Sequence, residues 1–124
     1  VKEIIKPTMI EKWAKAITQG EGDITGVNPG NMKYSPLTIS WGATKGRKAL
    51  DGGYFALFKN YDEGFKALCK FLTLGCHDEL RAFHQARTLD KFMTIYAGNP
   101  PIGYKKAIAQ SLGVDLNVDI SSFV

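Results

Sequence analysis

The sequence has no long apolar run. None of its stretches approaches the ~20 consecutive apolar residues that a membrane-spanning helix requires, so we expect no membrane insertion. The first seven residues also lack the apolar stretch of a signal peptide, and because the chain does not begin with methionine its localisation stays open. With 44% hydrophobic and 23% charged residues, the composition is typical of a soluble globular protein, and the length fits one domain, residues 1–124.

Cysteine is scarce. Cys69 and Cys76 are the only two, and on one continuous helix they would lie roughly 10 Å apart, beyond the reach of a disulfide. If Gly75 ends that helix first, a bridge remains geometrically allowed, so the pattern favours free thiols and leaves a disulfide open. His77 and His84 follow, but zinc sites normally pair close ligands as Cys-x2-4-Cys, which this spacing does not provide. We therefore expect no metal and no other cofactor.

Nucleic-acid signatures are also missing. The formal charge is +4, from 16 basic and 12 acidic residues, which favours an anionic partner. The densest basic stretch, Lys45-Gly46-Arg47-Lys48, is short and has few aromatic neighbours, and no helix-turn-helix, RNP or zinc-finger pattern accompanies it. We interpret the stretch as a solvated loop and expect no nucleic-acid partner.

Helical spacing dominates what is present. The sequence Thr8-Met9-Ile10-Glu11 is a capping-box pattern that opens the first predicted helix. Periodicity predicts five helices, at residues 8–20, 60–75, 78–86, 88–98 and 102–112. Residues 21–40 are rich in Gly, Asn, Pro, Ser and Thr and are predicted to be loop, and the β-prone residues 54–58 after an Asp-Gly-Gly turn predict a small hairpin. The fold class is therefore mostly α, with about five helices and one small β element.

Glu21 is the most informative single residue. It lies between Gly20 and Gly22, where the first helix gives way to the polar segment. Glycines on both sides let the backbone turn sharply and let a ligand approach the carboxyl group closely. Two interpretations follow: a solvated residue at a helix end, or a general acid, which needs a carboxyl group that still holds its proton near neutral pH.

Three further segments follow Glu21 in a familiar order. They are Asn28-Pro29-Gly30-Asn31-Met32-Lys33-Tyr34, Gly53-Tyr54-Phe55-Ala56-Leu57-Phe58 and Tyr96-Ala97-Gly98-Asn99-Pro100-Pro101. In this order and spacing, over roughly residues 21–113, the chain resembles small phage and bacterial proteins of the lysozyme-like superfamily, in the lytic transglycosylase and goose-type lysozyme group. The resemblance implies an α+β lysozyme-like fold.

The resemblance also implies a reaction. It implies cleavage of the β-1,4 bond between N-acetylmuramic acid and N-acetylglucosamine in peptidoglycan, with Glu21 matching the catalytic Glu. Tyr96 resembles the family tyrosine whose hydroxyl approaches that carboxyl group, although its spacing also suits a core residue.

The same resemblance supplies expected substrate contacts. Asn28, Asn31 and Tyr34 are the expected polar partners of sugar groups, with turn stabilisation as the alternative for the two asparagines. The main chain at Phe55 and Ala56 resembles the family's substrate-contacting strand.

A second carboxylate is harder to identify. Phage-type lysozymes carry an Asp eight residues after the Glu, but here that position is Pro29. Asp23 and Asp51 are the remaining candidates, and either also suits a turn. Lytic transglycosylases need no second carboxylate, because one Glu acts as acid and then as base while the substrate's own N-acetyl group stabilises the cationic centre. The sequence therefore favours a transglycosylase over a hydrolase.

The expected partner is thus the glycan strand of peptidoglycan, and we expect the protein to be a monomer. It would act at the bacterial cell wall, either after export, in the periplasm or after delivery by a phage. Two alternatives stay open. One is a non-catalytic wall-binding or virion structural module of the same fold. The other is a glycosidase that acts on chitin-like oligomers, which share the N-acetylglucosamine unit.

Overall fold

The computed structural model describes residues 7–23 and 25–124. The helices are α1 (Met9–Glu21), α2 (Pro36–Ser40), α3 (Tyr61–Cys76), α4 (Leu89–Tyr96) and α5 (Ile102–Leu112); the strands are β1 (Thr44–Lys48) and β2 (Tyr54–Leu57); and η1 (Arg81–Phe83) and η2 (Ile120–Phe123) are 3-10 helices. The predicted fold class, mostly α with one small β element, is confirmed.

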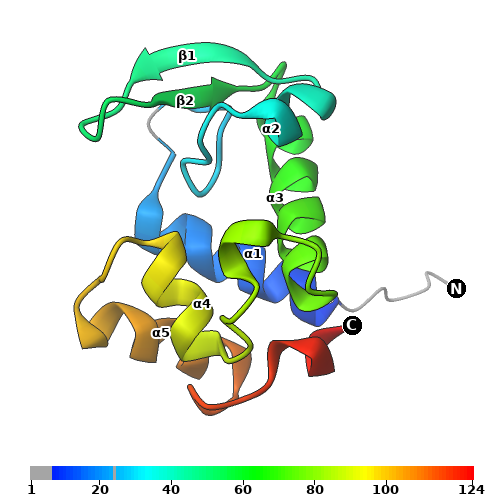
Figure 1. Ribbon diagram of the computed structural model, residues 1–124, viewed down its shortest axis with the longest axis vertical. Helices are drawn as coiled ribbons and strands as arrows, with labels where there is room; N and C mark the ends of the chain where they lie inside the picture. The colour runs from blue at the N-terminus through cyan, green and yellow to red at the C-terminus, as the bar shows by residue number, and fades with distance from the viewer. Residues whose placement is uncertain (1–6, 24) are drawn as a thin grey trace, which may run out of the picture.

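The elements form two parts joined by one helix. In Figure 1 the sheet and α2 lie at the top, while α1, α4 and α5 lie together at the bottom. Helix α3 runs between the two levels, beginning near the sheet and ending among the lower helices. No helix of the described residues is long and apolar enough to cross a membrane.

Strand β2 is paired along both of its edges. It is antiparallel to β1, with Thr44 opposite Leu57 and an irregularity between Lys45 and Lys48. On its other side, the backbone N–H of Ala56 donates to the Met32 carbonyl (2.9 Å), and residues 32–34 run alongside it. The prediction of a solvated loop at residues 45–48 was therefore wrong, because β2 supplies a hydrogen-bonding edge that the local sequence does not reveal.

Two helical predictions also need correction. The expected loop 21–40 contains α2, which starts with Pro36 and a capping box in which the side chains of Ser35 and Thr38 each bond the other's backbone N–H. The expected helix 78–86 is reduced to the 3-10 helix η1, which has no side-chain cap and follows Asp78 in the left-handed region (φ 59). The described residues form five α-helices, as predicted, but α2 takes the place of the expected helix 78–86.

Helix α1 ends one residue later than predicted. Thr8 caps its start by accepting the Glu11 N–H (3.1 Å). Glu21 is its last residue, and Gly22 follows with φ 78 and donates its N–H to the Thr18 carbonyl (2.8 Å). The catalytic candidate therefore belongs to the last helical turn.

Helix α3 passes through Gly75, so both cysteines lie on one helix. Cys69 and Cys76 are free. Burial raises the pKa of each thiol to about 11, which keeps both thiols protonated near neutral pH. The favoured interpretation, free thiols, is confirmed.

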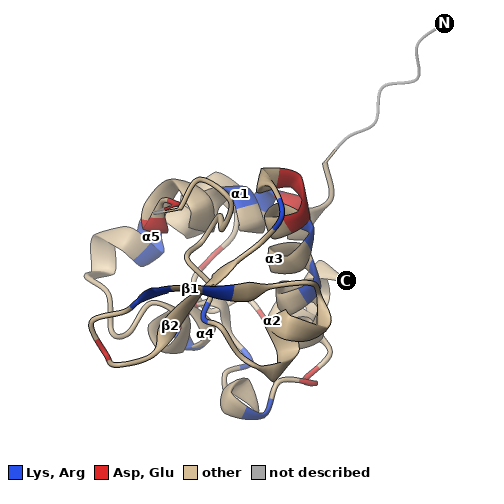
Figure 2. Ribbon diagram, turned by 90° about the horizontal axis from the view of Figure 1, so that it is seen from above, with Lys and Arg blue, Asp and Glu red and all other residues tan. Residues whose placement is uncertain are grey.

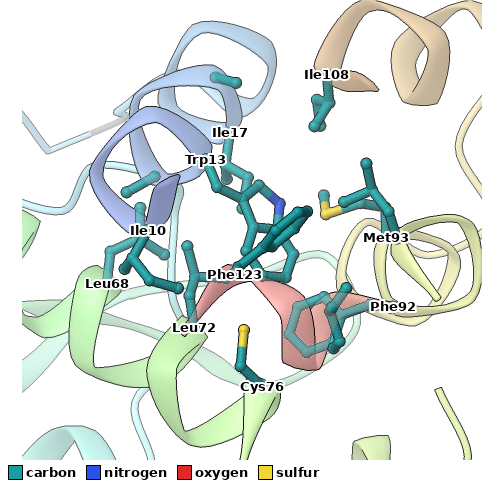
Figure 3. Close-up of a cluster of buried hydrophobic side chains, with 14 of the residues drawn as sticks. Ile10, Trp13, Ile17, Leu68, Leu72, Cys76, Phe92, Met93, Ile108 and Phe123 are labelled. Carbon is teal, nitrogen blue, oxygen red and sulfur yellow. The ribbon is translucent and has the colours of Figure 1, made fainter. Parts of the chain in front are cut away.

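The hydrophobic core forms where α1, α3, α4 and η2 meet (Figure 3). Trp13 is fully buried, and its ring lies edge-on to Phe92 (centroids 5.0 Å apart) and to Phe123 (5.4 Å). Leu68 and Leu72 of α3 pack in the same cluster and are also fully buried. Such burial contributes about 1.5–3 kcal/mol per large apolar side chain, which fixes α1, and with it Glu21, against the rest of the molecule.

Candidate active site

A cleft of about 730 Å³ separates the sheet side of the molecule from the helical side. From the sheet side it is lined by Met32, Lys33, Ser35, Thr38, Asp51 and Phe55, from the helical side by Phe71, Phe83, Ile95, Tyr96, Ala97 and Gly98, and between them by Glu21, Gly30 and Asn31. Most of the lining is apolar, with a few polar groups among it, which is typical of ligand sites.

Glu21 is held at both its backbone and its side chain. Its Oε1 accepts a hydrogen bond from the Tyr104 hydroxyl (2.9 Å), and its carbonyl accepts one from Asn31 Nδ2 (2.9 Å). Within residues 7–23 and 25–124, no group donates to the second carboxyl oxygen. One oxygen is thus fixed, and the other is free to meet a ligand in the cleft.

Tyr104 was not predicted as a site residue. It lies in the first turn of α5, and burial, followed by the charge of Glu21, raises its pKa, so its hydroxyl remains a donor. The ring fits because residue 20 is glycine: a Cβ there would lie 2.5 Å from Tyr104 Cε2. In the sequence, its register with Ile108 and Leu112 marks it only as a helix-face residue.

Tyr96 lines the cleft but bonds elsewhere. Its hydroxyl donates to the Gly30 carbonyl (2.9 Å), and burial, followed by the charges of Glu21 and Tyr104, raises its pKa. Its ring packs against Phe71 (centroids 5.9 Å apart). The role that the resemblance implied for Tyr96, a hydroxyl approaching the carboxyl group, is filled by Tyr104, because the loop at Gly30 occupies the Tyr96 hydroxyl.

The two asparagines have different roles. Asn28 is buried (1% exposed), and its side chain bonds both the N–H (3.0 Å) and the carbonyl (2.9 Å) of Met32. It therefore closes the turn and does not line the cleft, which is the alternative considered from the sequence. Asn31 does line the cleft, in the left-handed conformation (φ 52) that asparagine tolerates.

The two candidate carboxylates are also separated by the structure. Asp23 Oδ1 accepts the backbone N–H groups of Gly26 (3.0 Å) and Asn28 (2.8 Å), so it organises the loop and does not line the cleft. Asp51 lines the same cleft as Glu21. It forms an ion pair with Lys33 (3.1 Å), and the hydrogen bond from the Gly53 N–H, with the help of Lys33, lowers its pKa.

Of the expected contacts near β2, only Phe55 lines the cleft, where its ring lies 4.6 Å below the Lys33 ammonium group. Ala56 is fully buried and does not line the cleft, and its N–H is already bonded to the Met32 carbonyl. Tyr34 pairs through its backbone with Tyr54 and lies outside the cleft lining. The pairing of residues 32–34 with β2 therefore occupies the Ala56 backbone N–H, and a sugar contact by the Tyr34 hydroxyl stays a prediction.

No cluster of three His, Cys, Asp or Glu side chains within the described residues could hold a metal ion. Comparison with known protein families, with curated proteins and with solved structures finds no match for this chain.

Proposed function

We propose that the protein is a glycosidase that cleaves peptidoglycan at the bond between N-acetylmuramic acid and N-acetylglucosamine, with Glu21 as general acid and base. One observation carries the proposal: Glu21 lines the cleft between the two parts of the molecule, with one carboxyl oxygen held by Tyr104. The cleft volume of about 730 Å³ suits a segment of a sugar chain, and its largely neutral lining suits an uncharged glycan.

In the proposed reaction the Glu21 carboxyl group protonates the glycosidic oxygen as the bond to the muramic C1 breaks. The substrate's own acetamido oxygen stabilises the resulting positive charge at C1. The Glu21 carboxylate then removes the proton from the substrate's 6-hydroxyl, which attacks C1 and closes a 1,6-anhydro ring. The Tyr104 hydroxyl keeps the carboxyl group oriented through both steps.

This single-carboxylate mechanism is supported by the state of Asp51. Its side chain is 65% exposed and ion-paired with Lys33, and the lowered pKa keeps it charged. Because Asp51 lines the same cleft, a hydrolase in which it orients water is the second candidate. We favour the transglycosylase, since Lys33 and the Gly53 N–H already occupy the Asp51 carboxylate.

The test is Glu21→Gln, which preserves shape and removes the titratable proton. We expect it to lower the clearing of purified peptidoglycan by at least about 10²-fold, the usual loss for a general acid. The matched control is Glu79→Gln, at an exposed residue outside the cleft, which should clear as fast as the native protein. Undiminished clearing by Glu21→Gln would refute the assignment, and binding of peptidoglycan without any cleavage would indicate a non-catalytic wall-binding module.

The products separate the two mechanisms. A transglycosylase releases 1,6-anhydromuramic ends, whereas a hydrolase releases reducing ends, and mass spectrometry distinguishes them by one water. In parallel, Asp51→Asn should leave the anhydro products unchanged if Glu21 acts alone. Digestion of soluble chitooligosaccharides in preference to peptidoglycan would instead indicate a chitin-directed enzyme.

A further inference from the structure

The excess positive charge is confined to one part of the chain. Residues 28–59 contain five basic residues and one acidic residue, whereas the remaining residues contain eleven of each. The whole net charge of +4 therefore belongs to the segment that forms the sheet side of the cleft. A charge difference of this kind between two parts of one small protein directs anionic partners to one face.

Within that segment, three cations lie on β1. Lys45, Arg47 and Lys48 are exposed, and Figure 2 shows the blue of basic residues along this strand. None of the three forms an ion pair with a carboxylate of the described residues; in the helical part Lys105 pairs with Asp90, whereas Lys12, Lys15 and Lys106 likewise form no ion pair there. We name Lys45, Arg47 and Lys48 the β1 basic edge.

The backbone leaves this edge open. Sheet pairing joins β1 to β2 alone, and the opposite edge of β2 is covered by residues 32–34, so β1 is the outer strand of the described sheet. Lys45 and Lys48 lie opposite Ala56 and Tyr54, which are two residues apart on β2 and therefore on one face of the sheet, and Arg47 lies in the irregularity between them. Three neighbouring cations without carboxylate partners suit a linear polyanion better than a single small anion.

We propose that the β1 basic edge binds the phosphodiester polymer that many bacterial walls carry on their glycan strands; this choice of partner rests on the proposed function. The cleft, where Lys33 is already neutralised by Asp51, would then take the uncharged glycan while the edge takes the charged polymer joined to it. A single nucleic-acid strand is a poorer fit, because base stacking needs a free aromatic face. The ring of Tyr54, on the neighbouring strand β2, is covered by the Lys45 ammonium group at 4.0 Å.

The experiment measures binding separately from cleavage. In a Glu21→Gln background, the triple variant Lys45→Gln, Arg47→Gln, Lys48→Gln is compared with the matched control Lys12→Gln, Lys15→Gln, Lys106→Gln. Both variants remove three exposed charges and lower the net charge equally. Each is sedimented with walls that carry the phosphodiester polymer and with the same walls stripped of it by hydrofluoric acid, over a range of salt concentrations.

We expect the triple variant to bind polymer-bearing walls about tenfold more weakly and its salt dependence, log K against log[salt], to be shallower by about 2, as for three lost phosphate contacts. The control variant should keep the native affinity, and on stripped walls all proteins should bind alike. With Glu21 restored, the triple variant should cleave stripped walls at the native rate, because none of its three residues lines the cleft.

Three results would overturn the inference. Equal loss in the control variant would mean that binding follows net charge alone, and no loss in the triple variant would mean that the edge is not used. If the edge binds a single-stranded oligonucleotide of equal charge more tightly than it binds the walls, its partner is a nucleic acid. If it binds anionic lipid vesicles more tightly, with the exposed Leu50 at the hairpin turn in contact with the lipid, its partner is a membrane. A native protein that binds these walls through β1 but never cleaves them would refute the proposed function alone.

Discussion

At the scale of single residues, the site depends on two tyrosines that are easily confused. Tyr96 and Tyr104 both lie near Glu21, and burial, followed by the charge of Glu21, raises the pKa of both hydroxyls. Only Tyr104, which lies 83 residues after Glu21 in the sequence, donates to the carboxyl group, whereas Tyr96 donates to the Gly30 carbonyl. In the sequence, the three segments after Glu21 made it the candidate and the resemblance pointed to Tyr96; that Tyr104 is the donor depends on how α5 packs against α1 at Gly20.

This difference gives a matched pair of variants. Tyr104→Phe keeps the ring and removes the donor to Glu21, so we expect cleavage to fall about tenfold or more, since a hydrogen bond to a charged group contributes roughly 1.5–3 kcal/mol.

The control is Tyr96→Phe, which removes the same atom but leaves the Gly30 carbonyl unpaired. We expect it to lower the free energy of unfolding by about 1–3 kcal/mol while the folded protein keeps most of its cleavage rate. Initial rates of wall clearing and urea denaturation would measure both variants. An equal loss of cleavage rate in the two variants would contradict the separate roles.

At the scale of elements, the packing of α3 against the loop before α2 decides where the cleft residues lie. Gly64, in the first turn of α3, faces the backbone of the loop: a Cβ there would lie 2.5 Å from the Val27 carbonyl oxygen and 2.8 Å from Pro29 Cδ. The same loop continues into Gly30 and Asn31, which line the cleft. The sequence revealed the helix, but not that this glycine allows the loop to approach it.

We therefore expect Gly64→Ala to be destabilising by about 1–3 kcal/mol, because overpacking against backbone outweighs the gain of up to ~1 kcal/mol in helix propensity. Gly103→Ala in α5 is the control, since a Cβ there meets nothing within 4 Å, and it should be neutral or slightly stabilising. Urea denaturation of both variants measures the difference. A stabilised Gly64→Ala would show that the loop moves without cost.

Elements that depend on neighbours were the hardest to predict. The caps at Thr8, Asn60 and Thr88 accept the backbone N–H bonds that their sequences indicate, and the corresponding helices begin there. Strand β1, by contrast, exists because β2 pairs with it, and a run of lysine, glycine and arginine has little β propensity of its own. Its basic residues form a charged edge for that reason and not as part of a loop.

At the scale of the whole molecule, two exposed carboxylates make the free energy of unfolding depend on pH under acidic conditions. Backbone hydrogen bonds from Gly53 and Ser121 lower the pKa of Asp51 and Asp119, respectively, below the ordinary value of 3.8. A lowered pKa in the folded state means that stability is fully present above pH 3.8 and is lost as the pH falls through the folded-state pKa values.

We expect the urea midpoint to decrease between pH 5 and pH 2, and to decrease less in the double variant Asp51→Asn, Asp119→Asn. Asparagine keeps an oxygen acceptor for both backbone N–H groups and removes the titration. Denaturation curves at half-unit pH steps would measure the two slopes. Identical slopes would mean that other groups govern the acid response.

The sequence by itself determined the local parts: the capped helices, the β-prone run that becomes β2 and the helix-end setting of Glu21. These follow from interactions between residues a few positions apart, which periodicity and capping patterns record. Tertiary structure alone decided that Tyr104 reaches Glu21, that Asp51 and not Asp23 lines the cleft, and that the Asn28 side chain and the Ala56 N–H both bond Met32. Those outcomes depend on which surfaces pack together, and packing joins residues whose separation along the chain carries no local signal.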